Sequence, residues 1–300
     1  MNMNKMTESQ KWWALTFLVL AQFMIVLDIS ILNVALPSIQ KTFDLSVKDL
    51  QLIVVSYTLC FGGFLLLGGR AADLYGRRLV FLSGVVCFTV ISFLIGAADS
   101  SALMVPLRAL QGLSAAFMSP SALSLVLALF TERHARTRAL SIWGAVSAGG
   151  ATAGLLLGGI LTQYLNWRWN FFVNIPIGII VVIAGLRLLP SHAAQERSKT
   201  LDLPGAFLIT AGLMTLVYAL SQANSWGWTS ASSIGFIGLG LALIVAFIYN
   251  ESRALHPLVP FSIFRVGNVA AADMIQLPGI GLRERVYEGH QTCCDKKSAG

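Results

Sequence analysis

The stretch GRAADLYGRR, residues 69–78, lies between two apolar runs, residues 52–68 and 79–98. Each run has about 20 residues and is long enough to cross a bilayer as an α-helix. Because the connection has only ten residues, the two helices are expected to be antiparallel neighbours. Three arginines in so short a loop indicate the cytoplasmic side of a membrane. The stretch therefore predicts a helical hairpin in a membrane, together with its orientation.

The composition of the chain also favours an integral membrane protein. Of its 300 residues, 56% are hydrophobic and only 12% are charged, whereas soluble domains carry about 25% charged residues. The formal net charge of +7 does not indicate nucleic-acid binding, because Lys and Arg lie in short gaps between apolar runs. The sequence has no phosphate-binding glycine loop, no His-Glu-x-x-His pair and no Cys-x-x-Cys pair. We therefore expect no nucleotide, metal or other cofactor.

Eight apolar runs are predicted to span the membrane as helices. Counted from a cytoplasmic N-terminus, the cytoplasmic segments hold thirteen Lys and Arg and the external segments hold three. This bias alternates correctly at every loop, as the positive-inside rule requires. The predicted spans are residues 12–36, 52–68, 79–98, 102–130, 139–165, 171–189, 204–221 and 234–249.

The spans group into a simple domain organisation. A cytoplasmic N-terminus, residues 1–11, precedes a six-helix bundle, residues 12–190, and a cytoplasmic linker, residues 191–203. Two additional membrane helices follow within residues 204–250, and residues 251–300 are expected to be a cytoplasmic tail. The tail loses its apolar character after about residue 269, so disorder is expected from about residue 270.

Two ionisable residues lie inside predicted spans. Asp28 lies about 15 positions into the first span from the cytoplasmic side, and Arg108 lies a few positions into the fourth from the outside. At 1.5 Å per residue, both fall in the outer half of the membrane at similar depth. Because a charge in the membrane is costly, we expect an inward-facing, functional pair. The alternative is that Asp28 bonds to Ser30 or to backbone groups and Arg108 reaches the outer surface.

The fourth span also carries a polar stripe. Arg108, Gln111 and Ala115 share one helical face, and Gly112 follows Gln111. In the fifth span, Gly150, Gly154 and Gly158 recur at every fourth residue, and Gly159 follows them. Such small residues favour close helix packing, and a moving interface is the functional alternative.

The basic stretch at residues 69–78 carries side chains that can form specific contacts. Gly69 and Gly76 permit a tight turn and close helix approach. Asp73 can accept hydrogen bonds from a helix N-terminus or from an arginine such as Arg77 or Arg78. An ordinary positive-inside loop is the alternative interpretation.

These residues resemble the major facilitator superfamily, and within it the fourteen-span branch of drug:proton antiporters. The similarity extends over about residues 13–269, and a departure is Leu155, where the family's fifth-helix motif usually has proline. The resemblance implies an N-terminal six-helix bundle plus two additional helices, with the family's C-terminal half missing from this chain. The matching segments are residues 69–78 and LDISILNVALP at 27–37, Arg108-x-x-Gln111-Gly112, GLLLGG at 154–159 and WRWNFFVNIP at 167–176.

The resemblance further implies proton-coupled efflux of small amphipathic or cationic compounds across a bacterial inner membrane. The energy source would be the proton gradient, and the partners would be the lipid bilayer, a small-molecule substrate and either a separate C-terminal half or a second copy. The residues that the resemblance assigns to proton coupling and the substrate pathway are Asp28, Arg108, Gln111 and Gly112. Those assigned to a cytoplasmic gate are Gly69, Asp73, Gly76, Arg77 and Arg78. Those assigned to helix packing are Gly150, Gly154, Gly158 and Gly159.

Two other functions stay open at this point. The chain could be a truncated or frameshifted transporter fragment without transport activity, since apolar character is lost where a ninth span is due. It could also be a membrane scaffold or binding protein. An enzyme is not expected, because no nucleophile–base or metal constellation is present.

Overall fold

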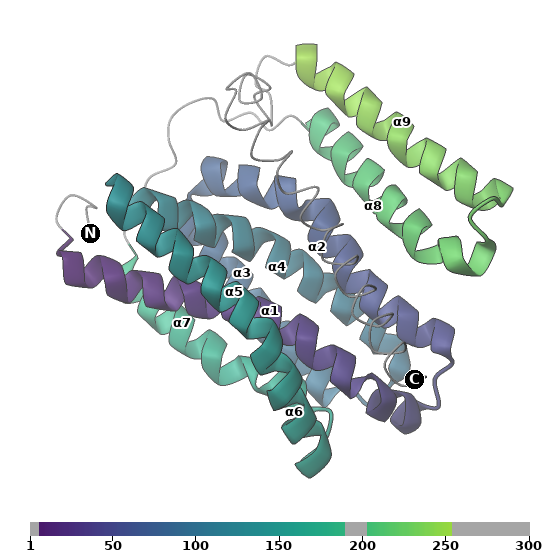
Figure 1. Cartoon of the computed structure of the whole chain (residues 1–300), viewed down its shortest axis with the longest axis horizontal. Helices are drawn as coiled ribbons and strands as arrows, with labels where there is room; N and C mark the ends of the chain where they lie inside the picture. The colour runs from purple at the N-terminus through teal and green to yellow at the C-terminus, as the bar shows by residue number, and fades with distance from the viewer. Residues whose placement is uncertain (1–5, 190–202, 254–300) are drawn as a thin grey trace, which may run out of the picture. The chain divides into compact units, whose positions relative to one another are not determined.

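The computed structural model describes residues 6–189 and 203–253, and within these ranges it is helical with no β-strand (Figure 1). Eight helical segments there are long and apolar enough to cross a membrane, with α6 and α7 forming one of them. The prediction of an all-α protein with eight spans is confirmed. The helices are α1 (Glu8–Phe43), α2 (Val47–Tyr75), α3 (Arg77–Ala97), α4 (Ser101–Leu129), α5 (Arg133–Tyr164), α6 (Trp169–Phe172), α7 (Asn174–Leu188), α8 (Leu203–Trp226) and α9 (Ala231–Arg253).

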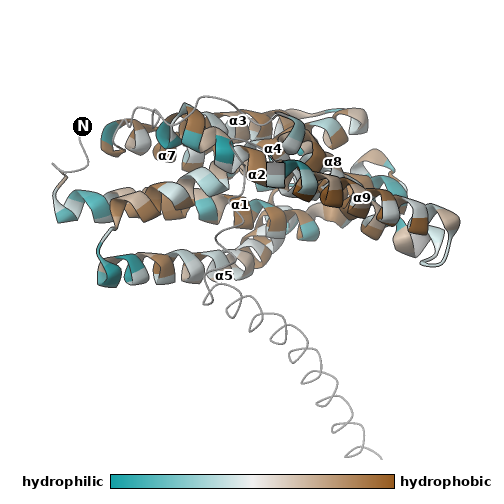
Figure 2. Ribbon diagram, turned by 90° about the horizontal axis from the view of Figure 1, so that it is seen from above, coloured by the Kyte–Doolittle hydropathy of each residue, from teal (hydrophilic) through white to brown (hydrophobic). Residues whose placement is uncertain are grey.

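The helices extend beyond the apolar runs from which they were predicted. α1 begins at Glu8 inside the predicted polar terminus, where Thr7 and Gln10 form a capping box, and it continues to Phe43. Ser46 is the N-cap residue of α2, and its side chain accepts a hydrogen bond from the backbone N–H of Asp49. The helices are longer than the predicted spans because an apolar run measures only the part of a helix inside the bilayer, while capped helical turns continue into water. Figure 2 shows hydrophilic residues at the N-terminal ends of α1 and α5.

Other predicted boundaries fall partly outside the described residues. The linker, predicted as residues 191–203, lies outside them except for Leu203, which starts α8. The tail predicted from residue 251 lies outside them except for its first three residues, which are the last of α9. The disorder predicted from about residue 270 also lies outside the described residues.

A single residue connects α2 and α3, and the predicted ten-residue loop is wrong. α2 continues to Tyr75 and α3 begins at Arg77, so only Gly76 lies between them, with φ 98° and ψ 126°. Side chains disfavour this conformation, and glycine adopts it readily. Gly69 lies inside α2, where an added Cβ would be 3.7 Å from Pro120, an ordinary contact. The turn therefore depends on Gly76 and not on Gly69.

Replacing Gly76 with alanine should lower the free energy of unfolding by about 1–3 kcal/mol, because a Cβ is strained at this φ. Gly69→Ala is the matched control and should leave stability unchanged or raise it by up to about 1 kcal/mol, because alanine is the better helix former. Unfolding of the purified chain in mixed SDS and mild-detergent micelles, followed by circular dichroism, measures both. Equal losses in the two variants would contradict the assignment of the turn to Gly76.

The sixth predicted span is interrupted near its outer end. α6 ends at Phe172 and α7 begins at Asn174, with Val173 between them. Pro176 has no backbone N–H and so cannot donate to the carbonyl of Phe172 four residues earlier. The local break places the side chain of Asn174 at the first turn of α7, where it contributes to the site described below.

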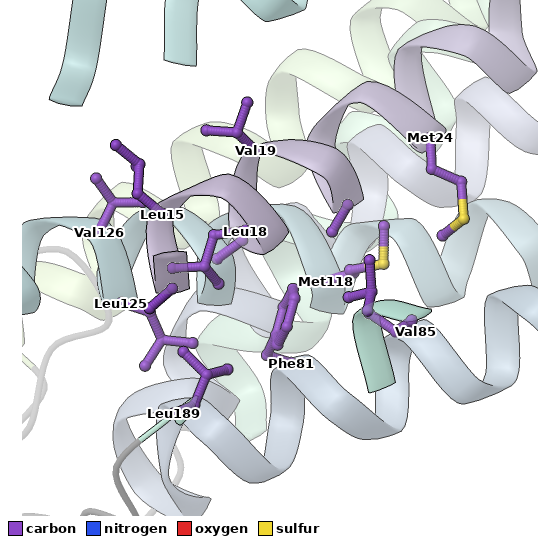
Figure 3. Packing of buried hydrophobic residues seen from close by; sticks show 14 of the residues in the cluster. Leu15, Leu18, Val19, Met24, Phe81, Val85, Met118, Leu125, Val126 and Leu189 are labelled. Carbon is purple, nitrogen blue, oxygen red and sulfur yellow. The ribbon is translucent and has the colours of Figure 1, made fainter. Parts of the chain in front are cut away.

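The apolar core joins α1, α3, α4 and α7 (Figure 3). Among the described spans, α1 and α4 are the most buried. The two ionisable residues inside the spans therefore lie on the two central helices. Labelled members of the core cluster are Leu15, Leu18, Val19, Met24, Phe81, Val85, Met118, Leu125, Val126 and Leu189.

Candidate functional site

Asp28 of α1 and Arg108 of α4 form a buried ion pair. Arg108 Nη1 lies 2.7 Å from Asp28 Oδ2, and each side chain is 1% exposed. The structure thus brings together two charges that are 80 residues apart in the sequence. Arg108 does not reach the outer surface. Because a charge buried in a membrane protein requires a partner, the pairing explains how both residues are accommodated.

Two amide side chains complete the surroundings of the carboxylate. Gln111 Nε2 donates to Asp28 Oδ1 at 3.0 Å and to Ser92 Oγ at 2.8 Å, while Gln111 Oε1 accepts from Arg108 Nη1 at 2.6 Å. Asn174 Nδ2 also donates to Asp28 Oδ1, at 3.1 Å. We call these five residues, Asp28, Ser92, Arg108, Gln111 and Asn174, the polar cluster; all are buried.

An aromatic ring covers the cation of the polar cluster. The Cζ atom of Arg108 lies 4.4 Å from the centroid of the Tyr57 ring on α2, a geometry in which the ring stabilises the cation. Gly112 allows this approach, since an added Cβ would overlap the carbonyl oxygen of Tyr57. Gly112 therefore acts at the α2–α4 contact and not on the ion pair directly.

Three polar atoms around the cluster are buried without a hydrogen-bond partner among the described residues. They are Tyr57 Oη, Arg108 Nε and Asn174 Oδ1. Arg108 Nε can donate, Asn174 Oδ1 can accept and the Tyr57 hydroxyl can do both, so the site has unused capacity for water or for a polar group of a ligand.

The sequence analysis assigned no site role to Ser92, Tyr57 or Asn174, although Asn174 lies in the family-like segment at residues 167–176. Ser92 and Tyr57 are uncharged residues in apolar runs, and no pattern distinguishes them. Asn174 does carry a signal, since it is an amide at the start of a predicted span and immediately precedes Ile175-Pro176. A buried amide in a membrane helix needs hydrogen-bond partners, which could have marked it as a site residue.

The residues assigned to the cytoplasmic gate make contacts within the bundle. Arg77 Nη2 lies 3.4 Å from Asp73 Oδ1, in a pair whose side chains are 38% and 51% exposed. An exposed pair of this kind contributes little stability. Arg78 Nη2 donates to the carbonyl of Leu186 at 2.6 Å and so joins the start of α3 to the last turn of α7. A gate role for this stretch stays a prediction.

Three glycines of α5, Gly150, Gly154 and Gly158, face α1 at the point where the two helices cross (Figure 1). An added Cβ at Gly154 would be 2.6 Å from Ser30 Cβ, and Gly150 and Gly158 also meet α1 at 3.1–3.3 Å. Gly159 does not belong to this face, because one residue turns a helix by about 100°, and an added Cβ there has no atom within 4 Å. Three of the four predicted packing glycines therefore pack against α1 near the polar cluster.

Eight membrane-spanning helices, with a buried ion pair between the two central ones, define a multi-pass α-helical membrane protein. The Major Facilitator Superfamily profile matches residues 18–278. The chain belongs to this superfamily, which is a class of membrane transporters, and the predicted family is confirmed.

Curated relatives extend this finding. Puromycin resistance protein pur8 of Streptomyces alboniger is 44% identical over 253 residues, which cover 84% of this chain and 50% of that protein. Cephamycin export protein CmcT of Amycolatopsis lactamdurans is 41% identical over 88% of this chain and 55% of its own length. Multidrug resistance protein Stp of Mycobacterium tuberculosis is 38% identical over 253 residues, which cover 84% of this chain and 47% of that protein. The chain thus spans about half the length of the curated relatives it matches.

Solved structures agree on the fold. The human organic anion transporter MFSD10 superposes with a TM-score of 0.55 at 18% sequence identity, covering 71% of this chain and 56% of that chain. At this level of identity the similarity supports the fold and carries no information on substrate.

Proposed function

We propose that this chain works in the proton-coupled export of small amphipathic or cationic compounds across a bacterial inner membrane. The observation that carries the proposal is the buried contact between Asp28 and Arg108 at 2.7 Å. Support comes from relatives whose names describe puromycin resistance, cephamycin export and multidrug resistance. The distribution of Lys and Arg supports a cytoplasmic N-terminus and C-terminal tail.

In the proposed mechanism, Asp28 carries the transported proton. As a carboxylate it attracts Arg108, and as a neutral acid it loses this ion pair, so the two protonation states favour different α1–α4 arrangements. In transporters of this kind the substrate lies between repeats near the middle of the membrane. α1 and α4 are the central helices, so a change between them would act on that region. The α1–α5 glycine crossing provides a second surface at which α1 can move.

An apolar cavity supports the amphipathic part of the proposed substrate class. It has a volume of about 400 Å³, lies between the N-terminal parts of α1 and α5, and is lined in part by Trp12, Trp13, Ile142 and Val146. This volume is in the usual range for sites that bind small molecules. The Arg138 guanidinium lies 5.0 Å from the ring of Trp12, so a positive charge lies beside this cavity, and the cavity supports the amphipathic members of the proposed substrate class and not the cationic ones.

The proposal can be tested with the purified chain in liposomes across which a pH gradient is imposed. Radiolabelled puromycin, the antibiotic in the name of a relative, serves as the probe. We expect the gradient to drive puromycin accumulation and Asp28→Asn to reduce it at least about tenfold, because the amide cannot titrate. Asp99→Asn is the control, since it removes the same charge from a side chain that is 92% exposed.

Two results would contradict the proposal. Accumulation that survives Asp28→Asn would exclude Asp28 as the proton carrier. Puromycin binding without any gradient-driven movement would exclude transport of this probe and favour the membrane binding protein considered above.

A further inference from the structure

The two carboxylate oxygens of Asp28 have different partners. Oδ2 accepts from Arg108 Nη1, whereas Oδ1 accepts from the amides of Gln111 and Asn174. This division follows the contact between the central helices: Oδ2 faces the cation of α4, while Oδ1 is also bonded to α7. The two oxygens of Asp28 are therefore not equivalent as sites of protonation.

Elementary chemistry determines the orientation of both amides. A guanidinium group can only donate, so the Gln111 atom that lies 2.6 Å from Arg108 Nη1 must be oxygen. Gln111 Nε2 then faces Asp28 and Ser92. A carboxylate can only accept, so the Asn174 atom at 3.1 Å must be nitrogen. Asp28 Oδ1 thus faces two N–H donors.

We infer that Asp28 takes up its proton on Oδ2, and that Gln111 and Asn174 are positioning residues that hold Oδ1 in both protonation states. The inference rests on the proposed function, in which Asp28 is the coupling group. A proton on Oδ1 would direct an O–H group against two N–H donors. A proton on Oδ2 leaves Oδ1 as a carbonyl oxygen, which accepts both N–H groups.

In this step an O–H bond of a hydronium ion breaks, its proton forms a bond to Oδ2 and a water molecule is released; the carboxylate charge is neutralised, and Arg108 loses its ionic partner. Arg108 keeps its contacts with the Oε1 atom of Gln111 at 2.6 Å and with the faces of Tyr57 at 4.4 Å and Phe171 at 5.9 Å. The cation therefore stays where it is. Asp28 Oδ1 remains bonded to Gln111 of α4 and Asn174 of α7, so protonation removes the ionic part of the α1–α4 contact and keeps the hydrogen bonds of α1 to both helices.

The pH response of the polar cluster depends on the charged and titratable groups that face Asp28. Among the described residues, the charged or titratable ones are Arg108 of α4 and Tyr57 of α2, which interacts electrostatically with both members of the pair. α3 and α7 contribute the neutral side chains Ser92 and Asn174 to the cluster, and α5 approaches with Gly154. A pH response of this cluster is therefore that of Asp28 and its immediate partners.

Infrared difference spectroscopy of the full chain in lipid nanodiscs tests which oxygen is protonated. On acidification, the carbonyl stretch of protonated Asp28 is identified as the band that Asp28→Asn removes. We expect Asn174→Ala to shift this band to higher wavenumber, because the carbonyl oxygen loses one hydrogen bond.

Matched variants keep the test interpretable. Asn174→Leu keeps the approximate side-chain size without polar atoms and should give the same shift, with folding checked by circular dichroism. Ser114→Ala is the control, because the Ser114 hydroxyl donates to the Leu110 carbonyl within α4, and it should leave the band unmoved.

The outcomes separate this inference from the proposed function. A band that stays in place in both Asn174 variants would place the proton on Oδ1 and overturn the inference, whatever the transport result. The absence of any Asp28 band would show that Asp28 takes up no proton, which would overturn the proposed function and the inference together. A shifted band supports the inference even if puromycin is not transported.

Discussion

Replacement of Arg108 with methionine is expected to lower the free energy of unfolding by about 3–5 kcal/mol. The substitution leaves the Asp28 carboxylate, which is 1% exposed, without an opposite charge. Its two amide partners supply hydrogen bonds but no compensating charge. Unfolding of the purified chain in mixed micelles, monitored by circular dichroism, measures the loss.

Combining Arg108→Met with Asp28→Asn should recover most of this stability. Removing both members of a buried ion pair is often close to neutral, whereas removing one leaves an isolated charge. The amide introduced at position 28 can also donate to the Gln111 oxygen that Arg108 no longer occupies. The losses from the two single substitutions should therefore be strongly non-additive.

The exposed pair of Lys11 and Glu8 provides the control for this cycle. Its ions are 2.6 Å apart, but the side chains are 25% and 70% exposed. Lys11→Gln should cost less than about 1 kcal/mol, because water screens such pairs. Additive losses at Asp28 and Arg108, or a loss as small as that at Lys11, would contradict a tightly coupled buried pair.

Replacement of Gly112 with alanine is expected to lower the free energy of unfolding by about 1–3 kcal/mol, and valine should cost more. The added Cβ would overlap the Tyr57 carbonyl oxygen, so α2 and α4 must separate. The shift would also move the Tyr57 ring away from Arg108. Gly144→Ala is the matched control: an added Cβ there has no atom within 4 Å, so stability should be unchanged or rise by up to about 1 kcal/mol.

A second glycine at the same interface sharpens this test. An added Cβ at Gly68 of α2 would overlap the backbone oxygen of Ala116 on α4. Because either substitution separates the same two helices, Gly68→Ala and Gly112→Ala together should cost less than the sum of the single losses. Equal effects at Gly112 and Gly144 would contradict the close α2–α4 approach.

The candidate site shows how far sequence reasoning extends. The depths of Asp28 and Arg108 follow from counting residues along helices of known rise, so a meeting of these two charges could be expected. Ser92 and Tyr57 share that depth, yet an apolar run gives no sign that they face the pair. Counting residues along a helix gives the depth of a side chain in the membrane, but it does not identify the neighbouring helix that the side chain contacts.

The basic stretch at residues 69–78 also combines a feature that the sequence predicts with one that it does not. Its composition predicted a connection between two antiparallel helices, and a connection is present. It is the single residue Gly76 and not a ten-residue loop, because helical hydrogen bonding continues past the end of an apolar run. The contact of Arg78 with Leu186 joins positions 108 residues apart, which no local pattern indicates.

The sequence by itself determined the all-α membrane class, the eight spans and the family of this protein. It could do so because a segment in lipid must satisfy its backbone hydrogen bonds internally, which makes a long apolar run a helix whatever its neighbours are. Only the tertiary structure decided which residues meet: the amides on Asp28 Oδ1, the Tyr57 ring over Arg108, and Gly154 rather than Gly159 against α1. These contacts depend on how each helix is rotated about its axis, and that rotation is set by the packing of side chains from distant parts of the chain.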